Sequence, residues 1–257
     1  MKITDFSPTE SLKPFIKTYR IIESQDELVN RVLPGTSLTI AFRCKGEVNY
    51  IKENYPDKLS VSTISGIRKS VRLIHYSKNT TTLIILFKET GATAFFKEPL
   101  HELFEESVPL DNFIPQQKIN LIEELLAETK NHNQKIAIIE QFLLSKLYNY
   151  KPDKLISAAI SLIQSKKGNV KIKELADTLF ISQDAFEKRF RKTVGSSPKQ
   201  FCSVIRMKAI IDQKQQNKNL IDLAIDAGYF DQPHFNKDFK LFTGQTPGEF
   251  FNFPSFW

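Results

Sequence analysis

The chain has 257 residues, of which 41% are hydrophobic and 11% aromatic, so it can bury a core and is not a disordered polar chain. Its length is compatible with two domains of ordinary size. Only two cysteines are present, Cys44 and Cys202, which excludes a disulfide scaffold or a multi-cysteine zinc module. The N-terminus lacks the apolar stretch of a signal peptide, and no apolar run is long enough to cross a bilayer. These features predict a soluble cytoplasmic protein with no membrane partner.

The positive charge is concentrated in the C-terminal two-fifths of the chain. The net charge is +7, from 36 basic and 29 acidic residues. Residues 1–150 hold 19 basic and 18 acidic residues (+1), whereas residues 151–257 hold 17 and 11 (+6). A basic domain attracts polyanions, and nucleic acid is the commonest of these in a cell. The alternative is a lysine-rich surface that serves only solubility.

Residues 1–115 are predicted to be mainly β-structure. Short runs of alternating or fully apolar residues are separated by Gly, Pro and Asn turn signals. Strands are expected at residues 37–42, 59–62, 71–76 and 82–87, and flanking helices at residues 11–19 and 92–97. Many short strands with frequent turns are typical of a small barrel or sandwich.

Residues 116–152 change to a helical period and form a linker with two apolar stripes, separated by a turn at residues 131–133. The stripes are Ile119, Ile122, Leu125 and Leu126, and then Ile136, Ile139, Phe142, Leu143 and Leu147. Two interpretations stay open: the stripes pack only on the neighbouring domains, or they form a dimer contact. A turn signal at residues 150–153 marks a domain boundary, after which the chain is predicted to be all helix.

Residues 172–251 contain an internal repeat. Five residues recur at a constant offset of 49, in the pairs Phe186/Phe235, Phe190/Phe239, Gly195/Gly244, Pro198/Pro247 and Phe201/Phe250. Upstream, Leu175-Ala176 matches Leu223-Ala224 at an offset of 48, so the second unit gains one residue in its turn. Five matches at one spacing are hard to obtain by chance. The sequence therefore predicts two copies of one unit.

Each unit has the pattern of a helix-turn-helix. In the first unit, a short helix and a turn at residues 180–181 precede Ser182, which can cap a second helix at residues 183–194. In the second unit, a turn at residues 228–230 precedes a helix that begins at Asp231. A glycine ends each second helix.

These second helices have the properties of DNA-reading helices. Phenylalanines at i and i+4 anchor one face, so the opposite face can enter the major groove. Two such helices on a rigid connector could reach successive major-groove segments about 34 Å apart on one side of a duplex. Lysine and arginine around them would neutralise phosphates.

The same residues resemble the AraC/XylS-type bacterial transcription regulators over about residues 155–251. The most specific blocks are residues 186–192, residues 224–240 and Gly244-Gln245-Thr246-Pro247. The resemblance implies an all-α DNA-binding domain of seven helices, with a long helix at about residues 198–214 between the two helix-turn-helix units. The chain departs from the family pattern at Phe251 and at Lys188, where the family has arginine.

The N-terminal half resembles, more weakly, the β-rich sensory domains of such regulators, through Pro14, Tyr19-Arg20, Leu33-Pro34-Gly35 and Gly66. The expected fold is therefore α+β with two domains. A cupin-like barrel or sandwich with flanking helices at residues 1–115 would bind an effector or dimerise. Residues 116–152 would be the helical linker, and residues 153–257 the AraC-type domain with two helix-turn-helix units joined by a long helix.

The expected function is sequence-specific DNA binding and transcription regulation, controlled by a small-molecule effector or by dimerisation. The candidates for base contacts are Gln183, Asp184, Glu187, Lys188, Gln232, Asn236 and Lys237. Gln and Asn suit adenine, Lys suits guanine, and an acidic side chain either accepts from cytosine or faces solvent. The candidates for phosphate contacts are Arg191, Lys192, Lys199 and Lys240.

The expected partners are double-stranded DNA, RNA polymerase, a small-molecule effector and a second copy of the chain, within the cytoplasm and associated with the nucleoid. The effector site is not assigned. Arg20, Arg43, Arg68 and Arg72 either line an effector pocket or lie on a solvated surface.

No motif for catalysis is found. The four histidines form no metal-ligand pattern, and neither a P-loop nor a G-x-G-x-x-G fingerprint occurs, so no metal, cofactor or catalytic residue is expected. His234 is expected to pack or cap rather than read a base. Two alternatives remain: a DNA-repair alkyl-transfer protein, which would need a reactive cysteine cluster, and a catalytic β-barrel that uses the helical domain only for binding.

Overall fold

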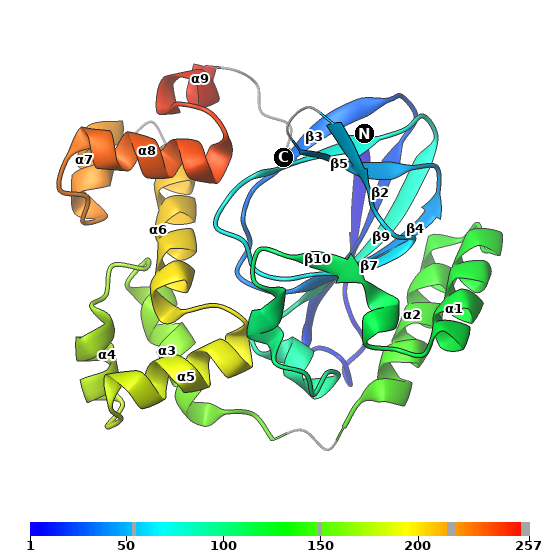
Figure 1. Cartoon of the computed structure of the whole chain (residues 1–257), viewed down its shortest axis with the longest axis horizontal. Coiled ribbons are helices and arrows are strands. Elements are labelled where there is room, and N and C mark those ends of the chain that lie inside the picture. The colour runs from blue at the N-terminus through cyan, green and yellow to red at the C-terminus, as the bar shows by residue number, and fades with distance from the viewer. Residues whose placement is uncertain (53–54, 149–150, 215–218, 253–257) are drawn as a thin grey trace.

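The computed structural model describes residues 1–52, 55–148, 151–214 and 219–252. Figure 1 shows a β-rich N-terminal part followed by an all-helical C-terminal part. The strands are β1 (Lys2–Phe6), β2 (Ile16–Ser24), β3 (Leu28–Val32), β4 (Thr39–Lys45), β5 (Val48–Lys52), β6 (Tyr55–Lys58), β7 (Ser62–Ser65), β8 (Arg72–Tyr76), β9 (Thr80–Phe87) and β10 (Ser107–Pro109). Three short 3₁₀ helices are η1 (Gly91–Ala94), η2 (Leu100–Leu103) and η3 (Leu110–Asn112).

The strands form two antiparallel sheets. One has the order β1-β2-β9-β4-β7-β10 and the other β3-β8-β5-β6. The core of the large sheet follows from the apolar residues of β9: Ile85 lies opposite Tyr19 of β2 and Ile40 of β4, and all three are fully buried. Because the strands described here pair as two separate sheets, they confirm the β-rich domain, while its closure into a cupin-like barrel stays a prediction.

The two helices predicted beside the strands are wrong in their extent. Residues 11–19 instead form a turn followed by the start of β2, which pairs with β9 from Ile16 onward. Pro14 lacks an amide donor, and β-branched and aromatic residues follow it, so this segment favours a sheet over a helix. Residues 92–97 form only the short helix η1, which ends before Pro99.

The linker helices are α1 (Gln116–Glu128) and α2 (His132–Lys146). Asn131 caps α2, because its side chain accepts from the amides of Asn133 at 2.8 Å and Gln134 at 3.3 Å. Both apolar stripes are mostly buried in the same core as the large sheet. The stripes therefore pack against the N-terminal domain, and the dimer contact stays a prediction.

The C-terminal part has seven helices in the described residues: α3 (Lys154–Ser165), α4 (Ile172–Thr178), α5 (Gln183–Val194), α6 (Pro198–Lys214), α7 (Leu220–Asp226), α8 (Gln232–Thr243) and α9 (Pro247–Asn252). The long helix α6 belongs to two hydrophobic cores. Phe201 and Cys202 pack with α3, α4 and α5, whereas Met207 and Ile210 pack with α7, α8 and α9. One helix therefore holds both predicted units.

Candidate nucleic-acid interface and effector cavity

Helix α5 is the second helix of the first unit, and we call it the first recognition helix. Ser182 caps it by accepting from the amide of Ala185 at 3.4 Å, and Gly195 ends it in the left-handed conformation at φ 89°. Phe186 and Phe190 are fully buried, with their ring centroids 5.7 Å apart. The predicted cap, anchors and stop are all confirmed, and they leave the opposite face of the helix exposed.

Helix α8, the second recognition helix, repeats this arrangement. Asp231 caps it by accepting from the amide of His234 at 2.7 Å, and Gly244 ends it at φ 77°. Phe235 and Phe239 are buried, with ring centroids 5.5 Å apart. The offset of 49 residues in the sequence is thus a repeat of structure as well as of residues.

The two recognition helices lie at opposite ends of α6 and point the same way (Figure 1). Their C-terminal ends face the N-terminal domain: Gly195 lies against Leu100, and Gly244 lies against Val71. Their N-terminal ends point away from that domain. The 17 residues of α6 make it about 26 Å long. The two helix N-termini are therefore presented on one side of the molecule, away from the N-terminal domain.

The predicted base-contact residues lie on the accessible faces of these helices. Gln183, Asp184, Lys188, Gln232 and Lys237 are exposed, and Glu187 and Asn236 are half-buried. The predicted phosphate contacts Arg191, Lys192, Lys199 and Lys240 are all exposed as well. The candidates for base contacts therefore lie on the accessible face of α5 and α8. Among the candidates for phosphate contacts, Lys199 lies at the start of α6, outside both recognition helices.

Several charges on α5 already have partners. The Glu187 carboxylate accepts from Gln183 at 2.9 Å and lies 3.7 Å from Arg191. Arg189 donates two hydrogen bonds to Asp153, at 2.6 and 3.0 Å, and so ties α5 to the start of α3. Burial opposes ionisation of Asp153, but the hydrogen bonds from Arg189 and from the Ile156 amide, together with the Arg189 charge, outweigh it and lower the pKa of this carboxyl.

His234 packs beside an aromatic ring, and its not reading a base stays a prediction. Its ring lies edge-on to Tyr229 with centroids 5.3 Å apart, and its Nε2 lies 3.6 Å from the Asp238 carboxylate. These contacts hold the imidazole along the second recognition helix.

Two residues of this surface were missed by the sequence analysis. Phe180 and Phe230 lie in the turns before the recognition helices, with 98% and 96% of their side chains exposed. Phe180 also has a left-handed backbone, at φ 54°. The repeat in the sequence could have revealed Phe180, because an offset of 48 aligns this residue with a glycine, Gly228. Gly228 has a left-handed backbone as well, at φ 83°.

A cavity of about 570 Å³ lies between the two sheets of the N-terminal domain. Its lining is largely apolar and includes Ile22 and Ile84 from the large sheet and Ile74 from the small one. The helix α6 closes part of it with Lys208, Ile211 and Asp212. The cavity is therefore shared between the β-rich N-terminal domain and the helix that carries both recognition units.

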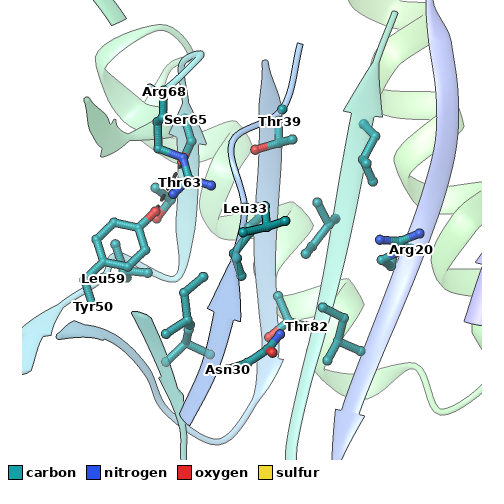
Figure 2. Close-up of a pocket in the computed structure, with 18 of the residues that line it drawn as sticks. Arg20, Asn30, Leu33, Thr39, Tyr50, Leu59, Thr63, Ser65, Arg68 and Thr82 are labelled. Atoms are coloured by element: carbon teal, nitrogen blue, oxygen red, sulfur yellow. Dashed lines mark hydrogen bonds between the residues drawn. The ribbon is translucent and has the colours of Figure 1, made fainter. Parts of the chain in front are cut away.

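The polar groups of the cavity are unevenly satisfied (Figure 2). Arg20, at one side, donates to both carboxylate oxygens of Asp5, at 2.7 and 2.8 Å. At the other side, the buried Nη1 of Arg68 and Oδ1 of Asn30 have no hydrogen-bond partner. Burial and then the neighbouring charge of Arg72 lower the pKa of Arg68 to about 10.

Arg72 and Tyr50 form a polar network beside Arg68. The Tyr50 hydroxyl lies 2.9 Å from both Arg72 Nη1 and Ser107 Oγ, and the Arg72 side chain also donates to the Glu105 carbonyl. Burial raises the pKa of Tyr50, but the Arg72 charge and these hydrogen bonds outweigh it and lower the pKa overall. Of the four arginines proposed for a pocket, Arg20, Arg43 and Arg68 line the cavity and Arg72 supports its wall.

Within the described part of the chain, no three His, Cys, Asp or Glu side chains gather as a metal site, and no helix is long and apolar enough to span a membrane. Burial raises the pKa of the Cys202 thiol to about 11 and also raises that of Cys44.

Comparison with known proteins supports the interpretation of the helical part. Residues 175–252 match the model of the family described as "Helix-turn-helix domain". The C-terminal domain is a helix-turn-helix domain of the AraC type. Residues 4–109 match a family described only as a domain of unknown function. The AraC-type domain thus accounts for the two recognition helices, and the cavity lies in the domain without a described role.

Two curated relatives match part of the chain. An uncharacterized HTH-type transcriptional regulator of Haemophilus influenzae is 25% identical over 154 residues, which is 59% of this chain and 51% of the relative. The Msm operon regulatory protein of Streptococcus mutans is 26% identical over 153 residues, 58% of this chain and 55% of the relative. The chain therefore spans about half the length of the curated relatives it matches.

Among solved structures, ToxT from Vibrio cholerae covers 97% of this chain and 98% of its own, with 10% identity and a TM-score of 0.48. The C-terminal domain of AraT from Geobacillus stearothermophilus covers 42% of this chain and 92% of its own, with 18% identity and a TM-score of 0.38.

Proposed function

We propose that the protein is a sequence-specific DNA-binding transcription regulator of the cytoplasm. The observation that carries this proposal is the pair of capped, phenylalanine-anchored recognition helices whose N-termini share one open face. Gln183, Lys188, Gln232, Asn236 and Lys237 would read base edges there. Asp184 and Glu187 would accept from cytosine amino groups, and Arg191, Lys192, Lys199 and Lys240 would bind phosphates.

Selection of bound duplexes from a random DNA pool by the full chain tests this proposal. We expect one enriched motif with two half-sites about one helical turn apart, and an affinity that falls steeply with salt. A pool that yields no motif, together with binding that is indifferent to salt and to competitor DNA, would refute it.

We further infer that the cavity of the N-terminal domain takes a small-molecule effector. The unpaired Nη1 of Arg68, the unpaired acceptor of Asn30 and the apolar walls favour an organic anion with an apolar body and a donor group. Because α6 closes part of the cavity, a bound molecule would contact the helix that carries both recognition units. RNA polymerase and a second copy of the chain are further proposed partners.

A matched pair of probes tests the effector site. We expect 4-butylbenzoate to raise the thermal unfolding temperature of the full chain, and its neutral isostere 4-butylbenzamide to raise it less, because only the carboxylate can pair with Arg68. Equal effects of both probes would refute the anion preference.

The alkyl-transfer alternative has little support from the cysteines. A nucleophilic cysteine needs a thiolate at neutral pH, whereas burial keeps both thiols protonated. We therefore propose a non-enzymatic regulator, and an alkyl-acceptor assay with the full chain is expected to show no transfer to either cysteine.

A further inference from the structure

The turns that precede the two recognition helices each expose a phenylalanine almost completely. Phe180 and Phe230 are 98% and 96% exposed, while the next most exposed large hydrophobic side chain among the described residues is Tyr55, at 77%. A phenyl ring in water forgoes the stabilisation that burial would give it. Packing within this chain therefore does not account for either ring.

The backbone at Phe180 makes this choice of residue more unusual. Its φ of 54° lies in the left-handed region, which costs free energy for a residue with a side chain and none for glycine. The equivalent residue of the second unit is Gly228, at φ 83°. Stability would favour glycine at both positions, and such an outlier is a reason to look for a role in binding.

Both rings lie at the edge where a duplex would approach. Phe180 lies two residues before the cap Ser182, and Phe230 lies directly before the cap Asp231. The turns that carry them are on the face turned away from the N-terminal domain (Figure 1). A recognition helix enters the major groove by its N-terminal end, so these two side chains would be among the first to meet the base edges.

The charges of the recognition helices are nearly balanced, which gives apolar contacts more weight. Helix α8 and its cap carry Lys237 and Lys240 against Asp231 and Asp238. Two of the four cations of α5 are already paired with carboxylates of the chain. The net charge of these helices is therefore small, and apolar contacts can add to the selection of bases. The most apolar group that DNA presents in its major groove is the C5-methyl of thymine.

We propose that Phe180 and Phe230 pack against thymine C5-methyl groups and select thymine at one position in each half-site. The inference rests on the proposed function, since it names two further specificity residues of the same interface. A single methyl contact of this kind is worth about fourfold in affinity.

A cycle of protein and DNA changes tests this contact. The probe is the duplex that the wild-type full chain selects from a random pool, with each thymine replaced in turn by deoxyuridine, which removes only the methyl group. We expect one replacement in each half-site to weaken wild-type binding about fourfold. The Phe180→Gly and Phe230→Ser variants should each bind the thymine duplex several-fold more weakly, and each should become indifferent to the replacement in its own half-site.

Three controls separate this contact from other effects. Phe180→Gly relieves the left-handed strain, so its unfolding temperature should not fall and weaker binding cannot be ascribed to misfolding. Leu125→Ala removes an exposed apolar side chain of α1 and should leave DNA affinity unchanged. Lys192→Gln, at a proposed phosphate contact, should lower the salt dependence, which the phenylalanine variants should not change.

The inference would be overturned if the losses of DNA affinity caused by the phenylalanine substitution and by deoxyuridine were additive. It would also be overturned if both variants bound the thymine duplex with wild-type affinity. Normal DNA binding with lost transcription activation would also overturn it and would assign the rings to a protein partner. If the wild-type chain selects no duplex at all, the proposed function fails, which is a different outcome.

Discussion

Removing the charge of Arg68 should stabilise the protein. Arg68 is a half-buried cation whose Nη1 has no hydrogen-bond partner and whose near neighbour is another arginine. Its pKa falls from 12.5 to about 10, a difference of about 2.5 units that corresponds to about 3 kcal/mol of unfavourable free energy for the charged form. The Arg68→Met variant keeps most of the aliphatic stem and loses this term.

Part of that gain is offset because the charge of Arg68 is attracted by Tyr50 and Glu105. We expect Arg68→Met to raise the free energy of unfolding by about 1–2 kcal/mol at neutral pH, measured by urea denaturation with an unchanged m-value. The matched control is Arg20→Met, which lies on the same cavity but is paired with Asp5. The free energy of unfolding of this control should fall by up to about 1 kcal/mol, because the substitution breaks an ion pair that is partly exposed.

If the cavity binds an organic anion, the wild-type chain should become more stable than Arg68→Met when the ligand is present. A carboxylate at about 100 times its Kd should stabilise the wild-type chain by about 2.7 kcal/mol and leave Arg68→Met almost unchanged. A variant that is less stable than the wild type without ligand, or that gains as much as the wild type with ligand, would refute the reasoning about Arg68.

Three further changes test other parts of the fold. Asp153→Asn keeps the cap of α3 but loses the charge that holds Arg189, so it should cost about 0.5–1 kcal/mol at pH 7. Because the folded-state pKa of Asp153 is lowered, this difference should be present above its ordinary pKa of 3.8 and vanish as the pH falls through the folded value, as urea denaturation at several pH values would show. Gly168→Ala should cost about 2 kcal/mol or more, since its Cβ would lie 2.3 Å from the Cys202 carbonyl oxygen at φ 76°, whereas Gly248→Ala meets no atom within 4 Å and should be neutral or slightly stabilising in thermal unfolding. Phe186→Ala should cost about 3–5 kcal/mol, seen as partial unfolding of the C-terminal domain in hydrogen exchange, and an intact domain would contradict its anchoring role.

The helical domain could be predicted because its signals are local. The cap at Ser182, the phenylalanine anchors and the stop at Gly195 all lie within fourteen residues, and the bounds of α5 and α6 agree with the predicted ones. Repetition of the same signals 49 residues later made the second unit equally clear. Local capping chemistry and i, i+4 packing are determined by neighbouring residues, so one sequence suffices to recognise them.

The N-terminal domain was less predictable because its contacts are distant in the sequence. The segment at residues 16–24 is a strand only because β9 pairs with it, some sixty residues later. The Tyr50 hydroxyl meets Ser107 across 57 residues, and that contact shapes the wall beside Arg68. The sequence therefore did not distinguish Arg68, a cavity arginine, from a surface arginine, because the sheet register was not known.

Helix α6 connects the two helix-turn-helix units with the cavity of the N-terminal domain. Its first turns complete the core of one unit and its later turns complete the core of the other, so the helix fixes the spacing of the recognition helices. A molecule in the cavity touches α6 through Lys208 and Ile211 and would act on both units as one body. Such a ligand changes DNA affinity only as far as it binds the free and DNA-bound arrangements differently, and DNA must then change the affinity for the ligand by the same factor. Because α6 fixes the distance between the two recognition helices, an effector would change DNA affinity by changing how the AraC-type domain is oriented against the sheets.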